Sequence, residues 1–213
     1  MQTDALDFRR LGIAGNEWTL RAEAAAVILA GGASRRMGQD KSLLPVGGRP
    51  TIEHIARQFR RHFAEVIVSV GDAAPYAFLQ LPLVVDGAPE RGPLMGIAAA
   101  LAHSSRDLNF VTACDVPDVD LPLARRMLRA AAEGDYDAVV PRHGDGRMEP
   151  LHAVYRRRVL RVVRDLLRAG EGRVGAVFAR CRVKYIQLPA ATELANLNTP
   201  ADYAAYCAGS SAP

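Results

Sequence analysis

Residues 25–41 read AAVILAGGASRRMGQDK, and this stretch decides how the chain is expected to fold. It begins with the unbroken apolar run Ala25–Leu29, which is typical of a strand covered on both faces in a parallel sheet. A glycine-rich turn with a basic flank follows directly. Because the ligands of open α/β sheets bind beyond the carboxyl ends of the strands, this turn is expected to form part of a ligand site.

Apolar runs and helical patterns alternate along the rest of the chain. The expected strands are 25–29, 66–70, 83–85, 110–113, 138–140, 151–155 and 183–187. The expected helices are 51–63, 94–102, 121–132, 156–168 and 200–207. This order predicts a mostly parallel sheet between layers of helices, in a single domain of residues 23–208. Residues 1–22 are interpreted as a poorly ordered amino-terminal extension and residues 209–213 as a disordered tail.

The composition excludes several classes of protein. Among 213 residues, 27 Lys and Arg against 23 Asp and Glu give a formal net charge of +4, which suits a small polyanionic ligand. No basic run is interleaved with aromatic residues, so nucleic acid is not an expected partner. Three scattered cysteines provide neither a disulfide framework nor paired metal ligands, which favours a reducing, cytoplasmic compartment. No apolar run approaches the ~20 residues that cross a bilayer, so no membrane contact is expected.

The turn after the first strand offers backbone amides and cations to a phosphate. Gly31 and Gly32 lack a Cβ, so their amides can approach an anion closely and form a concave nest. Arg35, Arg36 and Lys41 add positive charges around the same ligand. The alternative is a tight strand-to-helix turn with a solvated basic flank. The turn is not a Walker A loop, because Gln-Asp-Lys follows its last glycine, and it contains no G-x-G-x-x-G.

Acidic residues follow two further predicted strands. The strand 110–113 runs into Cys114-Asp115-Val116-Pro117, where the proline ends the ladder and leaves Asp115 at the edge of the crevice. A carboxylate there suits Mg²⁺, which is usually held by one or two carboxylates together with substrate phosphates. The alternative is an aspartate that only opens the next turn. Asp86 ends another strand before Gly92-Pro93-Leu94, which is expected to open a helix.

The carboxyl-terminal third contains two further patterns. In Asn196-Leu197-Asn198-Thr199-Pro200, an extended backbone would place both asparagine side chains on one face, and Thr199 would cap the helix that Pro200 begins. Arginines recur around the predicted helix 156–168, at positions 156, 157, 158, 161, 164 and 168. They are interpreted as a solvated helix face, with contact to an acidic phosphate or a partner as the alternative.

Several of these patterns together resemble one family. Leu29–Lys41 fits L-A-G-G-x-S-x-R-M-G-x-D-K, and Gly48-x-Pro50 follows it. This closely resembles the signature loop of the MobA family, the molybdenum cofactor guanylyltransferases. The resemblance continues in C-D-x-P at 114–117, in GRMEPLHAVY at 146–155 and in N-x-N-T-P at 196–200. Glu149 stands where many relatives carry Gln, and an acid there would oppose a phosphate unless it is paired, for example with Arg147.

The resemblance implies a Rossmann-like nucleotidyltransferase fold, a three-layer α/β/α architecture. It implies Mg²⁺-dependent transfer of GMP from GTP to molybdenum-molybdopterin, with release of pyrophosphate. It assigns catalysis to Arg36, Lys41 and Asp115, with Asp115 as the metal ligand. The implied nucleotide-binding residues are Leu29, Ala30, Gly31, Gly32, Lys41, Gly71, Asp86 and Asp115. The implied acceptor-binding residues are Arg147, Asn196 and Asn198.

Other functions fit parts of the same sequence. A cytidylyl-transferring relative would use CTP; the L-A-G-G loop and Gly-Pro-Leu favour GTP, whereas Gly71 replaces an asparagine found near the base in guanylyl relatives. A non-enzymatic molybdopterin carrier would need neither Lys41 nor Asp115. A sugar-phosphate nucleotidyltransferase usually has a different loop. The expected partners are GTP, molybdopterin and molybdoenzyme maturation proteins, and the expected state is a monomer or a weak homo-oligomer.

Overall fold

The computed structural model describes residues 24–30, 40–87, 92–189 and 196–210. The strands are β1 Ala24–Leu29, β2 Pro45–Val46, β3 Arg49–Pro50, β4 Glu65–Val70, β5 Leu83–Val85, β6 Leu108–Ala113, β7 Ala138–Arg142, β8 His152–Arg156 and β9 Val183–Gln187. The α-helices are α1 Thr51–His62, α2 Pro93–His103, α3 Leu121–Glu133, α4 Leu160–Arg168, α5 Gly175–Phe178 and α6 Pro200–Ser210. Short 3-10 helices are η2 Lys41–Leu43, η3 Ala74–Leu79 and η5 Arg157–Val159.

Seven strands form one mostly parallel sheet in the order β5-β4-β1-β6-β8-β7-β9. β1 pairs in parallel with β4 and with β6, β5 is parallel to β4, and β9 is parallel to β7. Only β8, among the strands of the described sheet, runs antiparallel to its neighbours, β6 and β7. The chain returns from β7 to β8 through a hairpin and not through a crossover helix, which is why the direction reverses there. The predicted fold class is confirmed.

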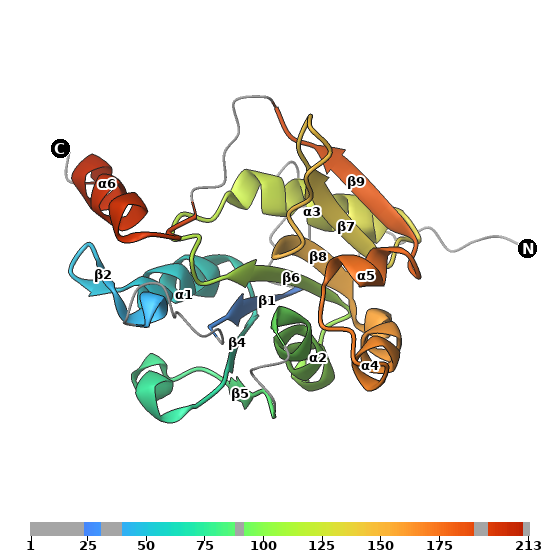
Figure 1. Ribbon diagram of the computed structural model, residues 1–213, viewed down its shortest axis with the longest axis horizontal. Helices are drawn as coiled ribbons and strands as arrows, with labels where there is room; N and C mark the ends of the chain where they lie inside the picture. The colour runs from blue at the N-terminus through green and yellow to red at the C-terminus, as the bar shows by residue number, and fades with distance from the viewer. Residues whose placement is uncertain (1–23, 31–39, 88–91, 190–195, 211–213) are drawn as a thin grey trace, which may run out of the picture.

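Helices cover both faces of this sheet (Figure 1). α1 and α3 lie on one face, whereas α2, α4 and α5 lie on the other. All six residues of β1 are buried. Ile28 belongs to the core beneath α1 and α3, and Val27 belongs to the core beneath α2 and α4. Because successive strand side chains point to opposite faces, a central strand between two helix layers must be apolar throughout, as the sequence of β1 is.

The predicted helix 156–168 is wrong at its beginning. Arg156 ends β8, residues 157–159 form η5, and α4 begins only at Leu160. The arginine series therefore does not surround one helix. Arg156 instead donates to the carbonyl oxygens of Ala131 (2.5 Å) and Gly134 (3.2 Å), at the end of α3.

The expectations for the two termini fall mostly outside the described residues. Residues 1–22 and 211–213 are not among them, and α6 continues to Ser210, two residues into the predicted tail. α6 lies at one end of the molecule, beside β2 (Figure 1). Within the described part of the chain, no helix is long and apolar enough to cross a membrane.

Candidate active site

Four parallel strands end at the same edge of the sheet and bring most of the predicted residues there. Asp86 follows β5, and its backbone N–H donates to Val70 O (2.9 Å) at the end of β4, directly before Gly71. Ala30, after β1, donates to Ser69 O (2.8 Å), and Cys114, after β6, donates to Leu29 O (3.0 Å). The carboxyl edge of β5, β4, β1 and β6 is where an α/β sheet binds its ligand.

Lys41 and Asp115 approach each other across the segment 196–198. The Lys41 Nζ donates to the carbonyl oxygen of Asn198 (2.8 Å), and the N–H of Leu197 donates to the carbonyl oxygen of Asp115 (2.8 Å). Burial raises the pKa of the Asp115 carboxyl, and the nearby Lys41 charge partly opposes that rise. A desolvated carboxylate within electrostatic reach of an ammonium group is the kind of perturbed pair that marks functional sites.

Asp115 rather than Cys114 carries the negative charge at this position. Burial, followed by the charge of Asp115, raises the pKa of the Cys114 thiol to about 12, so the thiol stays protonated. Among the residues that the structure describes, no three His, Cys, Asp or Glu side chains gather as a metal cluster. The Asp115 carboxylate is a hard oxygen donor, which suits an ion that takes its remaining ligands from phosphates and water.

Asp86 is buried beside the start of α2. A Cβ placed on Gly96 would lie 3.0 Å from Ser69 Oγ, 3.3 Å from Leu29 Cδ2 and 3.6 Å from Asp86 Oδ2. The missing side chain at Gly96 thus lets α2 approach the ends of β1 and β4. As predicted, Pro93 occupies the first turn of α2. The arrangement keeps Leu29 and Asp86 close to one point at the edge of the sheet.

Glu149 is paired, as its predicted position near a phosphate requires. One of its oxygens, Oε1, lies 2.7 Å from Arg147 Nη1 and 2.8 Å from His143 Nε2. Its charge also contributes to the raised pKa of Asp115, so the trio lies within electrostatic reach of the carboxyl edge. Arg147 pairs with Glu149, and the charge of Glu149 acts on Asp115 at this edge. The sequence did not indicate His143, which meets Glu149 across the β7–β8 hairpin.

The structure does not have the extended backbone that would place the side chains of Asn196 and Asn198 on one face. The N–H of Asn198 donates to Asn196 O (3.0 Å), which closes a tight turn, so the argument for a shared face fails. Leu197 is buried at the centre of this turn. Thr199 caps α6 as predicted: its Oγ1 accepts from the N–H of Asp202 (3.1 Å), while the Asp202 carboxylate accepts from the N–H of Thr199 (2.8 Å).

Four residues that were expected to surround the phosphates, Gly31, Gly32, Arg35 and Arg36, lie outside the described residues. Close to the end of that stretch, the structure shows a contact that sequence reasoning missed. Asp40 accepts hydrogen bonds from Tyr76 and Ser42. Tyr76 lies 36 residues further along the chain, and no sequence pattern points to it.

Comparisons with known proteins show the family of this chain. The family described as MobA-like NTP transferase domain matches residues 26–184. A protein of Pelotomaculum thermopropionicum named probable molybdenum cofactor guanylyltransferase is 41% identical over 187 residues, which cover 84% of this chain and 90% of that protein. A protein of the same name from Carboxydothermus hydrogenoformans is 38% identical over 183 residues, which cover 83% and 91%.

Solved structures share the fold. The molybdopterin-guanine dinucleotide biosynthesis protein A of Archaeoglobus fulgidus superimposes with a TM-score of 0.74 at 23% identity, covering 85% of this chain and 96% of that chain. The 2-C-methyl-D-erythritol 4-phosphate cytidylyltransferase of Thermus thermophilus gives 0.66 at 23% identity, covering 89% and 100%. At such identities the likeness shows the fold alone. The match over residues 26–184 and the relatives at 38% and 41% identity decide the family, and the chain belongs to the MobA-like NTP transferases.

Proposed function

We propose that this chain transfers GMP from GTP to the terminal phosphate of molybdopterin, with release of pyrophosphate. The relatives at 38% and 41% identity are named for guanylyl transfer in molybdenum cofactor synthesis, and the chain covers at least 90% of their length. The observation that carries the proposal is the approach of Lys41 and Asp115 across the segment 196–198, at the carboxyl edge of the parallel strands.

The reaction joins two anions, so the chain must neutralise charge and align phosphates more than it must supply a base. In this proposal Lys41 and Arg36 bind the triphosphate and stabilise the charge that develops on the leaving pyrophosphate. Leu29 and Ala30, at the end of β1, lie beside the nucleotide. Asp86, at the end of β5, and Gly71, at the end of β4, lie beside its nucleoside.

Asp115 is the residue that fits Mg²⁺. Its carboxylate is partly desolvated, and within the described part of the chain Lys41 is the cation that opposes the rise of its pKa. When bound, Mg²⁺ would supply charge neutralisation on the phosphate oxygens. Asn198, Asn196 and Arg147 remain the proposed acceptor-binding residues. Of these, Arg147 is held by Glu149, so it would act on the acceptor as part of a pair.

The direct test is a turnover assay of the full chain with Mg²⁺, molybdopterin and either GTP or CTP. We expect pyrophosphate release with GTP, and a product whose mass equals molybdopterin plus GMP. Molybdopterin should be supplied with and without bound molybdenum. Preference for CTP would assign the chain to cytidylyl transfer, whereas molybdopterin binding without pyrophosphate release would assign it to a carrier. Asp115→Asn should lower the rate of release about a thousandfold, and Lys41→Met should lower it strongly while leaving a measurable rate.

A further inference from the structure

The hydroxyl of Tyr76 lies at the base of the signature loop, residues 29–41. Tyr76 belongs to η3 and is 4% exposed. Its hydroxyl donates to Asp40 Oδ2, lies 3.0 Å from Ser42 Oγ and lies 3.4 Å from the carbonyl oxygen of Ala30. Ala30 and Asp40 are the described residues on either side of 31–39. One side chain therefore contacts both flanks of the loop.

The Asp40 carboxylate collects three donors. Oδ1 accepts from the N–H of Ser42 (3.0 Å) and from its Oγ (2.6 Å), while Oδ2 accepts from Tyr76. Burial, and then the hydrogen bond to Asp40, raise the pKa of Tyr76, so its hydroxyl remains a proton donor at neutral pH. Because the hydroxyl donates its one proton to Asp40, its approach to the carbonyl oxygen of Ala30 is a van der Waals contact and not a second hydrogen bond. The carboxylate is held in one orientation although the residue itself is exposed.

Lys41 stands between Asp40 and Ser42, and this network fixes its backbone. The N–H of Leu43 donates to Asp40 O (3.1 Å), and the N–H of Leu44 donates to Lys41 O (3.3 Å). Thr51, the first residue of α1, donates its N–H and its Oγ1 to Leu44 O, both at 2.8 Å. The short helix η2 is therefore fastened at both ends, and from it the Lys41 side chain reaches Asn198.

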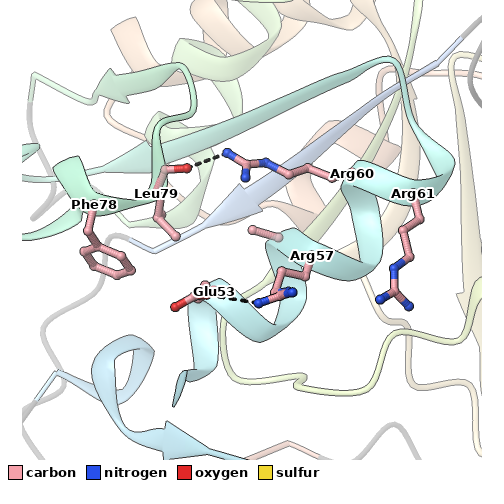
Figure 2. A pocket seen from close by; sticks show the side chains of 7 residues that line it. Glu53, Arg57, Arg60, Arg61, Phe78 and Leu79 are labelled. Carbon is pink, nitrogen blue, oxygen red and sulfur yellow. Dashed lines mark hydrogen bonds and ion pairs between the residues drawn. The ribbon is translucent and has the colours of Figure 1, made fainter. Parts of the chain in front are cut away.

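The element that carries Tyr76 is itself anchored. Arg60 of α1 donates to the carbonyl oxygen of Leu79 (2.5 Å), at the end of η3 (Figure 2). It also donates to the carbonyl oxygen of Gln80 (3.0 Å). α1 and η3 also enclose a hollow of about 420 Å³, lined by Glu53, Ala56, Arg57, Arg60, Arg61, Phe78 and Leu79. These lining residues do not include those of the candidate active site. Arg60 thus acts as a brace between α1 and η3.

We propose that Tyr76 is a positioning residue for Lys41. Its hydroxyl orients the Asp40 carboxylate, and Asp40 together with Ser42 fixes the backbone from which Lys41 reaches the triphosphate. Tyr76 touches neither substrate nor metal in this account. The inference rests on the proposed function only in that the anion bound by Lys41 is a nucleoside triphosphate.

A double-mutant cycle between Tyr76 and Lys41 tests this assignment. Tyr76→Phe keeps the buried ring and removes the hydroxyl. If Tyr76 acts through Lys41, this change should lower kcat/KM for GTP about tenfold in the wild-type background, and less than about twofold in the Lys41→Met background. The same cycle should be measured on binding of inorganic tripolyphosphate by calorimetry, which needs no turnover. Ser42→Ala removes a second donor to Asp40 and should show the same dependence on Lys41.

Tyr155→Phe is the matched control. Tyr155 is fully buried, and its hydroxyl donates to Pro150 O (2.7 Å), so this variant also loses one buried hydroxyl bond. Its thermal stability should fall, with no change in tripolyphosphate affinity. Equal losses from Tyr76→Phe in both Lys41 backgrounds, or no loss in either, would overturn the inference. A wild-type chain that binds tripolyphosphate in this Tyr76-dependent way but makes no nucleotide product would refute the proposed function and leave the positioning role standing.

Discussion

The two halves of the central sheet hold their aspartates in different ways. In the half formed by β5, β4, β1 and β6, burial raises the pKa of Asp115, and the nearby Lys41 opposes the rise only in part. In the half formed by β8, β7 and β9, hydrogen bonding to Arg158 lowers the pKa of Asp135. Arg158 also pairs with Asp137 (2.6 Å). The charge of Asp115 is compensated only in part and is available to a ligand, whereas the charges of Asp135 and Asp137 are paired with Arg158 and support the fold.

Replacing one aspartate by asparagine in each half is the strongest test of this difference. Asp115→Asn keeps the size of the side chain but removes the proposed metal ligand, so we expect activity to fall about a thousandfold. The free energy of unfolding should not fall, because the change removes a desolvated charge. Steady-state turnover and urea denaturation of one preparation measure both quantities.

Asp135→Asn is the control in the other half. Asp135 is exposed and pairs with Arg158 and Arg182, so its loss should leave turnover within about twofold of wild type. Loss of activity in Asp135→Asn, or retained activity in Asp115→Asn, would contradict the view that the half with Asp115 serves the reaction and the half with Asp135 serves the fold.

His152 connects the two halves and should make stability depend on pH. It is 1% exposed in β8, and its ring packs edge-on against Phe110 of β6. Burial lowers its pKa to about 4, compared with 6.5 for the free side chain. Between these values the unfolded chain binds a proton that the folded chain does not. The contribution to stability is therefore complete above pH 6.5 and should decrease by about 3 kcal/mol on going down to pH 4.

The measurement is the difference in unfolding free energy between wild type and His152→Gln, taken at several pH values from 4 to 7. Aspartates and glutamates titrate in both proteins, so the difference isolates His152. If the two stability curves stay parallel over this range, the folded histidine binds its proton normally and the prediction fails.

Arg156 should support the fold and not the reaction. It donates to Tyr136 O (3.0 Å) and to the carbonyl oxygens of Ala131 and Gly134, and so caps the carboxyl end of α3. Arg156→Met would leave these carbonyls without their donor, at a cost of about 2 kcal/mol in unfolding free energy. The KM for GTP and kcat should stay close to wild type. Arg157→Met, an exposed neighbour, should change neither stability nor turnover by a measurable amount.

The sequence predicted the parallel half of the fold more completely than the antiparallel half. Every predicted strand is present, with ends displaced by at most two residues. The reason is clearest for β1 and β4, because strands buried on both faces are nearly unbroken apolar runs. An apolar run does not specify the direction of a strand, so the antiparallel orientation of β8 was not predicted. The predicted helix start at Arg156 was wrong, because the apolar spacing of α4 continues backwards into η5. The end of β8 could therefore not be recognised from the sequence.

The site was predictable where a residue directly follows a strand. Asp115 was proposed this way, Lys41 was proposed from the basic flank of the glycine-rich turn, and the pairing of Glu149 with Arg147 was anticipated from charge alone. Tyr76 and His143 were missed because their partners, Asp40 and Glu149, meet them only through the folded chain. The turn at Asn196–Asn198 was missed because the burial of Leu197 between them depends on tertiary packing.

Glu149, between β7 and β8, acts through its charge on Asp115 in the other half, and its replacement should have the smallest effect. Its charge contributes to the raised pKa of Asp115, and it occupies Arg147. Glu149→Gln removes that charge and keeps a side-chain oxygen that can accept a hydrogen bond. The phosphate of molybdopterin should then be repelled less by residue 149. We expect the KM for molybdopterin to fall about threefold with kcat unchanged, since partly exposed pairs contribute roughly 0–1 kcal/mol.

The acidic limb of the pH–rate profile should also move to lower pH in Glu149→Gln, because less negative charge then faces Asp115. Asp145→Asn separates this effect from a general loss of acidity around Arg147. Asp145 Oδ2 lies 4.0 Å from Arg147 Nε, but Asp145 is not among the groups that raise the pKa of Asp115. Replacing Asp145 should therefore leave the acidic limb of the profile in place. A higher molybdopterin KM in Glu149→Gln would instead mean that Arg147 binds the acceptor only while Glu149 holds it, which would make the pair, and not the arginine alone, the acceptor-binding unit.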